Sequence, residues 1–131
     1  MFAAFVDVDR LTPANDAYGH DFGDEVLTSV ASALARTVRG GDMVGRWGGD
    51  EFIVVGIGQR PDPDEYAMRI RRHLVEGGMD AAKWMPSVSV GVAAMDPPFH
   101  SLDRMLARAD ADMYDRRRVR RLKSLPASGS A

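Results

Sequence analysis

Two short apolar runs flank the heptapeptide Arg46-Trp47-Gly48-Gly49-Asp50-Glu51-Phe52. Met43 and Val44 precede it, and the second run extends from Phe52 to Val55. Two such runs around a Gly-Gly pair predict a β-hairpin, because glycine can enter the positive-φ conformations that tight turns require. We therefore expect two adjacent antiparallel strands here, with the rest of the sheet built outward from them.

The far side of the predicted turn contains two adjacent acids, Asp50 and Glu51. Neighbouring carboxylates repel each other, and a turn that serves only the fold would avoid this. A bound cation would remove the repulsion, and carboxylate oxygens are the ligands that hard cations prefer. A solvated acidic turn is the simpler alternative, and these two residues alone leave both interpretations open.

The composition is that of a globular protein with a single domain. The chain has 131 residues, 45% of them apolar, and a net charge of −2 at pH 7. This charge argues against nucleic-acid binding, and no apolar run approaches the roughly 20 residues of a membrane helix. There is no cysteine and no signal-peptide pattern. We therefore expect a cytoplasmic domain without membrane contact of its own, although the full-length protein could be membrane-anchored.

Residues 2–8 form a nearly continuous apolar run, which predicts a strand buried on both faces near the centre of the sheet. Asp7 and Asp9 lie at the end of this run, on a shared face. A carboxylate inside an apolar strand is costly to bury without a partner. Asp7 could pair with an arginine, such as Arg10 or Arg46, or it could share a divalent cation with Asp50.

Two helices are expected next. Thr12 before Pro13 predicts an N-cap, and Gly19 is expected to close the short helix that follows. A longer helix should extend from about Phe22 to Val38, because apolar residues recur every four positions on one face. Asp24, near its start, is most simply an acid that favours the positive end of the helix.

The second half of the chain predicts a helix, a strand and a final helix. Asp62 should cap a helix that ends at Gly77, and residues 87–94 alternate as a half-buried strand does. Ser101 should cap the last helix, whose predicted inner face consists of Leu102, Leu106, Ala109 and Met113. The basic run at residues 116–121 is most simply a solvated helix end.

Motifs spread from Asp7 to about Arg121 match those of one known family. They are Asp7-Val8-Asp9, Asn15-Asp16-Ala17-Tyr18-Gly19-His20, Gly23-Asp24, Gly48-Gly49-Asp50-Glu51-Phe52, Ser89-Val90-Gly91-Val92-Ala93 and Ala109-Asp110-Ala111-Asp112-Met113-Tyr114. With these motifs in register, the chain resembles the GGDEF family of diguanylate cyclases. The resemblance implies an α+β sandwich of the ferredoxin-like, nucleotide-cyclase palm type, in which helices pack on a central, mostly antiparallel sheet.

The resemblance also implies a domain organisation. We expect residues 1–123 to be the GGDEF domain and residues 124–131 to be a flexible tail or linker. The family's usual N-terminal segment is missing, since the chain opens directly on the first strand. We therefore expect a longer parent protein with an upstream sensor or regulatory domain.

The activity implied by the resemblance is the Mg²⁺-dependent (or Mn²⁺-dependent) condensation of two GTP into cyclic di-GMP and two pyrophosphates. Each domain would bind one GTP, so catalysis would need an antiparallel homodimer, stable or transient. Asp50 and Glu51 would be the catalytic residues. The metal ligands would be Asp7, Asp50 and the backbone carbonyl of Val8.

The family's other sites can be placed in the same way. GTP would be bound by Asn15, His20, Asp24, Gly48, Gly49, Arg117 and Arg121. Among these, Asn15 and Asp24 would read the guanine edge, and the two glycines would let phosphates approach the backbone. Arg39 and Asp42 resemble the family's Arg-x-x-Asp site, at which cyclic di-GMP would bind and inhibit. The simpler alternatives are a helix-end histidine at position 20 and an ordinary helix end followed by a turn at residues 39–42.

Three positions depart from the family pattern. Thr12 stands where a phosphate-binding lysine is expected, Arg117 replaces a lysine, and Arg120 replaces a glycine. Thr12 has no charge, and its hydroxyl is expected to cap a helix, so we predict weaker GTP binding than the family norm, offset in part by Arg117 or Arg121. The alternative function is a weak or inactive GGDEF domain that binds GTP or cyclic di-GMP as a regulatory module. A purely structural remnant is disfavoured, because the acids of the motifs are intact.

Overall fold

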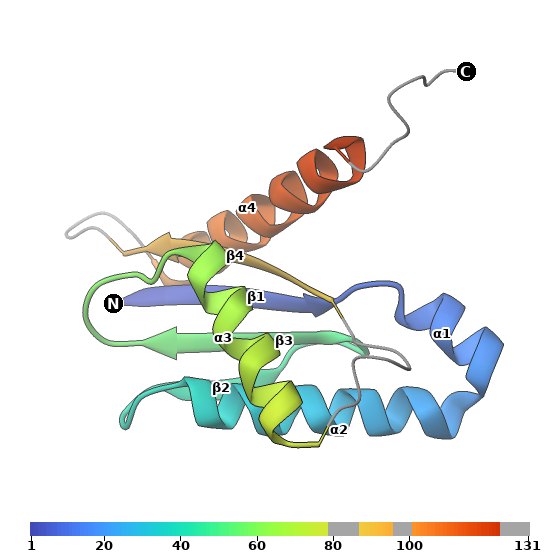
Figure 1. The fold of residues 1–131 in the computed structure, drawn as a ribbon. Coiled ribbons are helices and arrows are strands. Elements are labelled where there is room, and N and C mark those ends of the chain that lie inside the picture. The colour runs from blue at the N-terminus through green and yellow to red at the C-terminus, as the bar shows by residue number, and fades with distance from the viewer. Residues whose placement is uncertain (79–86, 96–100, 124–131) are drawn as a thin grey trace.

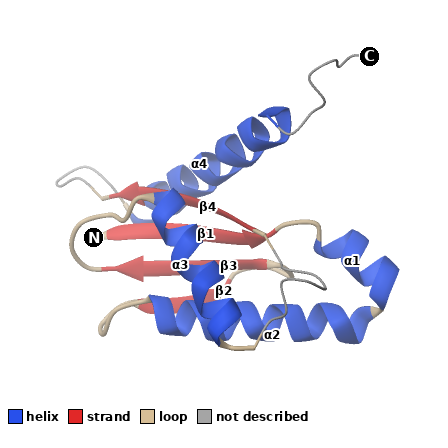
Figure 2. Ribbon diagram, viewed as in Figure 1, coloured by secondary structure: helices blue, strands red, loops and turns tan. Residues whose placement is uncertain are grey.

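The computed structural model describes residues 1–78, 87–95 and 101–123. In these residues the elements follow the predicted order β-α-α-β-β-α-β-α (Figure 2). The strands are β1 (Phe2–Val8), β2 (Met43–Arg46), β3 (Glu51–Gly56) and β4 (Val88–Ala94). The helices are α1 (Leu11–Tyr18), α2 (His20–Thr37), α3 (Pro63–Glu76) and α4 (Leu102–Lys123). The predicted tail at residues 124–131 lies outside the described residues.

The strands of the described chain form one sheet in the order β2-β3-β1-β4, with every neighbouring pair antiparallel. β1 lies inside the sheet and is buried along its whole length, as its apolar sequence predicted. The predicted hairpin is confirmed, since β2 pairs with β3. The expected α+β fold is therefore correct, with the strand order of a ferredoxin-like domain.

Helices cover both faces of the sheet (Figure 1). α4 packs on the face that contains Ala3 and Phe5 of β1, whereas α2 and α3 cover the opposite face. Figure 1 also shows α1 just beyond the C-terminal end of β1, at the end of the sheet where the β2–β3 turn lies. The acidic end of β1 and the acidic start of β3 therefore meet at this end of the sheet. None of the helices in the described ranges is both long enough and apolar enough to cross a membrane.

The fourth strand differs from its prediction. β4 is buried on both faces, so the expectation of a half-buried strand is wrong. Its small residues lie against α4: Ser89 contacts Arg117, Gly91 lies close to the α4 backbone, and Ala93 belongs to the apolar cluster beneath α4. The alternation of valine with small residues thus reflects close helix packing, not exposure to water.

The inner face of α4 is also displaced from the predicted one. Met105, Ala109 and Met113 are buried, whereas Leu102 is 48% exposed and Leu106 only borders the core. The buried face of α4 is therefore formed by Met105, Ala109 and Met113. Ala109 and Met113 were predicted correctly, and Leu102 was not.

The start of α1 is a second correction. The helix begins at Leu11 with Arg10 as the N-cap residue, so Thr12 lies inside the first turn and the predicted threonine cap is wrong. Arg10 has φ 58° and ψ 31°, and it makes no side-chain cap bond. The chain turns from β1 into α1 through this left-handed residue, and the turn leaves no place for a threonine cap.

The other predicted helix boundaries agree with the structure. Gly19 ends α1 with a positive φ of 92°. The Asp62 carboxylate accepts a hydrogen bond from the Asp64 N–H at the start of α3, and Ser101 Oγ accepts one from the Arg104 N–H at the start of α4. α2 begins at His20, slightly earlier than predicted.

Candidate active site

Three carboxylates converge where β1 ends and β3 begins. Asp7 lies opposite Glu51 in the β1–β3 register, and Asp50 immediately precedes Glu51. One carboxylate oxygen from each of the three lies within 4.8 Å of the others. The Val8 N–H donates to the Asp50 carbonyl at 3.0 Å, which fixes the hairpin turn against the end of β1. The hairpin therefore brings acids that are distant in the sequence into one cluster.

Asp7 is the most buried acid of this cluster, with 6% of its surface exposed. Its Oδ2 lies 3.0 Å from the guanidinium of Arg117, so neither Arg10 nor Arg46 is its partner, contrary to the interpretation drawn from the sequence. Its Oδ1 is buried and accepts no hydrogen bond from any described residue. A buried carboxylate oxygen without a partner is costly, and a bound cation would satisfy it.

Charge at the cluster is only partly neutralised. Burial raises the pKa of Asp7 to about 6, against the opposing effect of Arg117 and with smaller contributions from Asp50 and Glu51. Burial also raises the pKa of Glu51, and the nearby charges of Asp110 and Asp50 add to that shift. The positive charge of Arg117 thus does not offset burial and the neighbouring carboxylates at either Asp7 or Glu51. These donors fit a hard divalent cation, which would lower both pKa values.

Asp9 joins the end of β1 to β4 and α4. Its two carboxylate oxygens accept hydrogen bonds from the hydroxyls of Ser87 and Ser89, each at 2.6 Å. They also accept hydrogen bonds from the guanidinium groups of Arg117 and Arg120. Asp9 is therefore fully engaged with protein groups, unlike Asp7.

The basic end of α4 is not simply solvated, which corrects the prediction. Arg117 lies 3.0 Å from Asp7 and 2.9 Å from Asp9. Burial works against the charge of Arg117, but the two carboxylates outweigh it and raise its pKa. Sequence reasoning missed Ser89 and Arg120 at this site. The signals were a motif that contains Ser89 and the replacement of a glycine by Arg120. In the structure, the β1–β4 pairing places Ser89 opposite Asp7.

The hairpin turn is held by Arg46. Its Nε donates to the Gly48 carbonyl at 3.2 Å and its guanidinium Nη2 to the Gly49 carbonyl at 2.6 Å. Neither Gly48 nor Gly49 has a positive φ. The prediction that the turn needs glycine for a positive-φ conformation is therefore wrong. An added Cβ at Gly49 would meet nothing within 4 Å. A Cβ at Gly48 would instead contact the Glu51 side chain at 3.8 Å. Gly49 therefore leaves open space beside the acids, which suits close approach of a ligand.

A cavity of about 880 Å³ opens beside the acidic cluster. Asp9, Asp50 and the first turn of α1, including Thr12, line it. Its basic lining residues are Arg10, Arg117, Arg120 and Arg121. Arginine is suited to phosphate because its planar group can donate two parallel hydrogen bonds. The size and the excess of cations therefore suit a polyphosphate that arrives with a divalent cation.

The two residues predicted to read guanine, Asn15 and Asp24, lie with His20 around the corner between α1 and α2. Asn15 Oδ1 is buried and has no hydrogen-bond partner among the described residues. It packs on Gly23, where an added Cβ would collide with it. Asp24 lines a separate groove of about 480 Å³ between α2 and β2. His20 is the exposed first residue of α2. The structure thus brings Asn15 next to the residue that precedes Asp24.

Arg39 and Asp42 lie at the other end of the sheet, where β1 begins. The Asp42 carboxylate accepts hydrogen bonds from the Arg39 N–H at 3.1 Å and the Ile57 N–H at 3.4 Å. Asp42 therefore holds the loop between α2 and β2, which is the simpler role considered for it.

The same pair also lines a cavity of about 250 Å³. Arg60, Tyr66 and Arg69 are among the other lining residues. The Tyr66 hydroxyl is buried without a hydrogen-bond partner in the described chain, and burial raises its pKa to about 12, with a smaller contribution from Asp42. This second cavity therefore combines cations with an unsatisfied hydroxyl.

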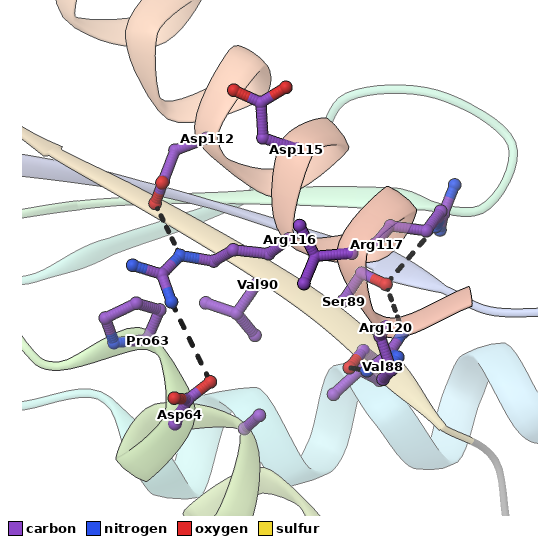
Figure 3. A pocket seen from close by; sticks show the side chains of 12 residues that line it. Pro63, Asp64, Val88, Ser89, Val90, Asp112, Asp115, Arg116, Arg117 and Arg120 are labelled. Atoms are coloured by element: carbon purple, nitrogen blue, oxygen red, sulfur yellow. Dashed lines mark hydrogen bonds and ion pairs between the residues drawn. The ribbon is translucent and has the colours of Figure 1, made fainter. Parts of the chain in front are cut away.

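A further cavity, of about 450 Å³, lies at the outer edge of β4 (Figure 3). In it, Arg116 reaches from α4 toward the start of α3, where it pairs with Asp64 at 3.9 Å. Its Nε also binds Asp112 at 3.1 Å, and Asp112 accepts a hydrogen bond from the Val92 N–H at 2.9 Å. Through these contacts, Arg116 and Asp112 link α4 to α3 and β4.

Known sequences match this chain along most of its length. The family model for "Diguanylate cyclase, GGDEF domain" matches residues 1–123. The probable diguanylate cyclase DgcC of Escherichia coli K12 is 33% identical over 123 residues, which cover 88% of this chain and 32% of DgcC. The response regulator PleD of Caulobacter vibrioides is 35% identical over 117 residues, covering 86% of this chain and 26% of PleD. The chain therefore spans about a third or less of the length of these relatives.

Solved structures share the fold. Diguanylate cyclase SiaD from Pseudomonas aeruginosa, solved in complex with its activator SiaC, matches with a TM-score of 0.74 and 32% identity, over 90% of this chain and 46% of that one. The GGDEF domain of DgcB from Caulobacter crescentus, solved in complex with c-di-GMP, matches with a TM-score of 0.70 and 28% identity, over 90% and 72% of the two chains. Sequence and fold point to the same family, and the chain belongs to the GGDEF domain family of diguanylate cyclases.

Proposed function

We propose that this domain condenses two GTP molecules into cyclic di-GMP and two pyrophosphates. The observation that carries the proposal is the convergence of Asp7, Asp50 and Glu51 within 4.8 Å of one another, beside a cavity rich in arginine. Phosphoryl transfer needs acidic ligands for a divalent cation and cationic donors for the phosphates, and this arrangement offers both. Relatives at about a third sequence identity are named diguanylate cyclases, which supports the choice of GTP.

Asp7 and Asp50 would hold Mg²⁺ or Mn²⁺, together with the backbone carbonyl of Val8. When bound, such an ion supplies positive charge to the phosphates and to the oxygens at which negative charge develops. The buried Asp7 Oδ1 supports this assignment, because it has no hydrogen-bond partner in the described chain. Arg117 contacts Asp7 and lines the cavity, so it would link the acids to a bound phosphate.

In the reaction, the 3′-oxygen of one GTP attacks the α-phosphorus of the other, and the bond from that phosphorus to pyrophosphate breaks. The same step in the opposite sense closes the ring. Asp50 would accept the proton of the attacking hydroxyl. Glu51 lies beside Asp50 and would orient that hydroxyl or a metal ligand. Arg117 and Arg121 would bind the phosphates, and Gly48 and Gly49, which carry no side chain, would let the phosphates approach the backbone.

The guanine would be read at the corner between α1 and α2. Asp24 would accept hydrogen bonds from the guanine N1–H and N2–H₂, a donor pair that adenine lacks. Asn15 would bind the same edge, and its buried Oδ1 without a partner supports a ligand there. His20, which is exposed one turn before Asp24, would lie against the nucleotide.

Two domains would be needed for one turnover. The described chain contains one cluster of acids at one end of its sheet, so a single copy would hold one GTP in position. Two copies facing each other in antiparallel fashion would bring each 3′-hydroxyl to the other α-phosphate. We therefore propose a homodimer as the working unit.

The direct test is to incubate the chain with GTP and Mg²⁺ and to quantify cyclic di-GMP and pyrophosphate by chromatography. We expect two pyrophosphates per cyclic di-GMP, with activity lost in Asp50→Asn. Asp103→Asn, which removes an exposed acid at the start of α4, should keep it. GTP binding without product would favour the regulatory-module alternative. Equal turnover by Asp50→Asn would contradict the role of the acid cluster.

We further propose that cyclic di-GMP binds at Arg39 and Asp42 and inhibits the enzyme. The adjoining cavity contains arginines that can bind phosphate and an unsatisfied tyrosine hydroxyl. Calorimetry should show that Arg39→Ala loses cyclic di-GMP binding, whereas Arg72→Ala, on the exposed surface of α3, retains it. Unchanged affinity in Arg39→Ala would rule this site out.

A further inference from the structure

Arg10 has a backbone conformation that the fold alone does not favour for arginine. Within the described ranges it is the one non-glycine residue with a positive φ. This conformation brings the Cβ too close to the backbone, and glycine, asparagine and aspartate tolerate it better. The Arg10 carbonyl still accepts the first hydrogen bond of α1, from the Ala14 N–H at 3.1 Å. A strained residue that persists at such a junction points to a role for its side chain.

The Arg10 side chain has no partner in the part of the chain that the structure describes. It is exposed and makes neither a hydrogen bond nor an ion pair there. It nevertheless lines the cavity of about 880 Å³ beside Asp50. Arg117 and Arg120, which line the same cavity from α4, are bound to carboxylates. Arg10 is therefore a cation available to an incoming anion without first leaving an acid.

Position also favours a phosphate as that anion. Arg10 and Thr12 both line the cavity, at the junction of β1 and α1. Thr12 has no charge, although the resemblance leads one to expect a phosphate-binding lysine at its place. A guanidinium two residues earlier can supply that charge and can also bind phosphate oxygens in pairs.

We propose that Arg10 binds the terminal phosphates of the bound nucleoside triphosphate and so supplies the cation that position 12 lacks. This inference rests on the proposed function, because that function identifies the triphosphate as GTP. It also changes the expectation drawn from Thr12 alone. GTP binding is not weakened by the threonine, since another side chain already holds the phosphate.

The test compares Arg10→Gly with the unaltered chain. Glycine removes the guanidinium and also relieves the positive φ, so the variant folds at least as well. The probe is 3′-deoxy-GTP, which lacks the attacking hydroxyl and stays intact during calorimetry in Mg²⁺ at fixed salt. Its affinity should fall about tenfold or more, which is the loss of one charge-assisted bond. GMP binding, measured by ligand-observed NMR, should not change. Arg10→Lys should retain most of the affinity.

Two further variants make the test specific. Arg118→Ala removes the same charge from an exposed position of α4 that does not line the cavity, and it should leave both affinities unchanged. Thr12→Lys should restore triphosphate binding in the Arg10→Gly background but change little in the unaltered chain.

Three results would overturn the inference. The first is an Arg10→Gly variant that binds 3′-deoxy-GTP as tightly as the unaltered chain. The second is an equal loss of GMP and triphosphate binding, which would indicate a structural role. The third is an equal gain from Thr12→Lys in both backgrounds. These results leave the proposed function intact, whereas failure of the unaltered chain to bind 3′-deoxy-GTP would overturn both.

Discussion

Burial of the ionised Asp7 carboxylate opposes folding, and the same buried carboxylate favours the binding of a cation. Its pKa rises from the usual 3.8 to about 6, chiefly through burial. The folded chain therefore binds a proton at this carboxyl more tightly than the unfolded chain does. The stability contributed by that proton is fully present below about pH 4 and is lost as the pH rises through about 6. At neutral pH, without a divalent cation, the ionised carboxylate works against the fold.

Asp7→Asn should consequently stabilise the cation-free protein at pH 7.5. A shift of about two pKa units corresponds to about 2–3 kcal/mol in the free energy of unfolding. Arg117 keeps Asp9 as a partner in this variant. Urea unfolding with a chelator present, from pH 4 to pH 8, should show the difference between variant and wild type growing through pH 6. A variant that is less stable than wild type at pH 7.5 would contradict this account of Asp7.

At the residue scale, the sequence predicts which acids meet but not which cations they meet. The residues alone left Asp7 open between an arginine and a cation shared with Asp50, and the family resemblance favoured the shared cation. The pairing of Asp7 with Arg117 could not be predicted, since it depends on how α4 lies across the sheet. The left-handed conformation of Arg10 could not be predicted either, because no local sequence pattern indicates a positive φ at an arginine.

At the scale of elements, the contact between α4 and β4 positions the site. Gly91 of β4 faces α4 so closely that an added Cβ would collide with the Met113 nitrogen and the Ala109 carbonyl. These are backbone atoms, which cannot rotate away. Arg117 lies one turn beyond Met113, so the same contact determines how near this arginine comes to Asp7 and Asp9.

Gly91→Ala should therefore destabilise the protein by about 3 kcal/mol or more, because overpacking against backbone leaves only helix displacement as relief. Urea unfolding would measure the loss. Gly40→Ala is the matched control, since its added methyl meets nothing within 4 Å and its φ is not positive. It should change stability by well under 1 kcal/mol. A Gly91→Ala variant as stable as wild type would show that α4 can shift freely.

The sequence predicts the elements themselves better than it predicts the reasons for their turns. Helix starts at Asp62 and Ser101 were predicted correctly because each has a capping side chain of the expected type. The start of α1 was not, because a left-handed Arg10 replaces the cap that Thr12-Pro13 suggested. The hairpin was predicted from Gly48 and Gly49, yet hydrogen bonds from Arg46 hold its turn.

At the scale of the whole molecule, the two candidate sites occupy opposite ends of one sheet. The acid cluster lies where β1 ends, and the Arg39–Asp42 cavity lies where β1 begins. β1 and β3 pair along this whole distance, from Asp7 opposite Glu51 at one end to Phe2 opposite Gly56 at the other, so both strands connect the two ends. The layers could be predicted from apolar periodicity. The cavities could not, because their shapes depend on side-chain packing.

If two copies must meet for turnover, specific activity should depend on protein concentration. Cyclic di-GMP formed per mole of chain should rise with concentration until the dimer is saturated, and then level off. Sedimentation measured over the same concentrations should show mass doubling in parallel. Constant specific activity at concentrations where the chain sediments as a monomer would contradict the proposed homodimer.

The central claim is that Asp7 and Asp50 together hold one divalent cation for the nucleotide. The most direct measurement is Mn²⁺ binding, followed by the electron paramagnetic resonance signal of the free ion, in the presence of 3′-deoxy-GTP. We predict that Asp7→Asn and Asp50→Asn each weaken Mn²⁺ binding by at least about tenfold, and that the double variant loses much less than the product of the two losses, because both residues serve one site. Wild-type Mn²⁺ affinity in either single variant, or losses that multiply independently, would contradict the claim.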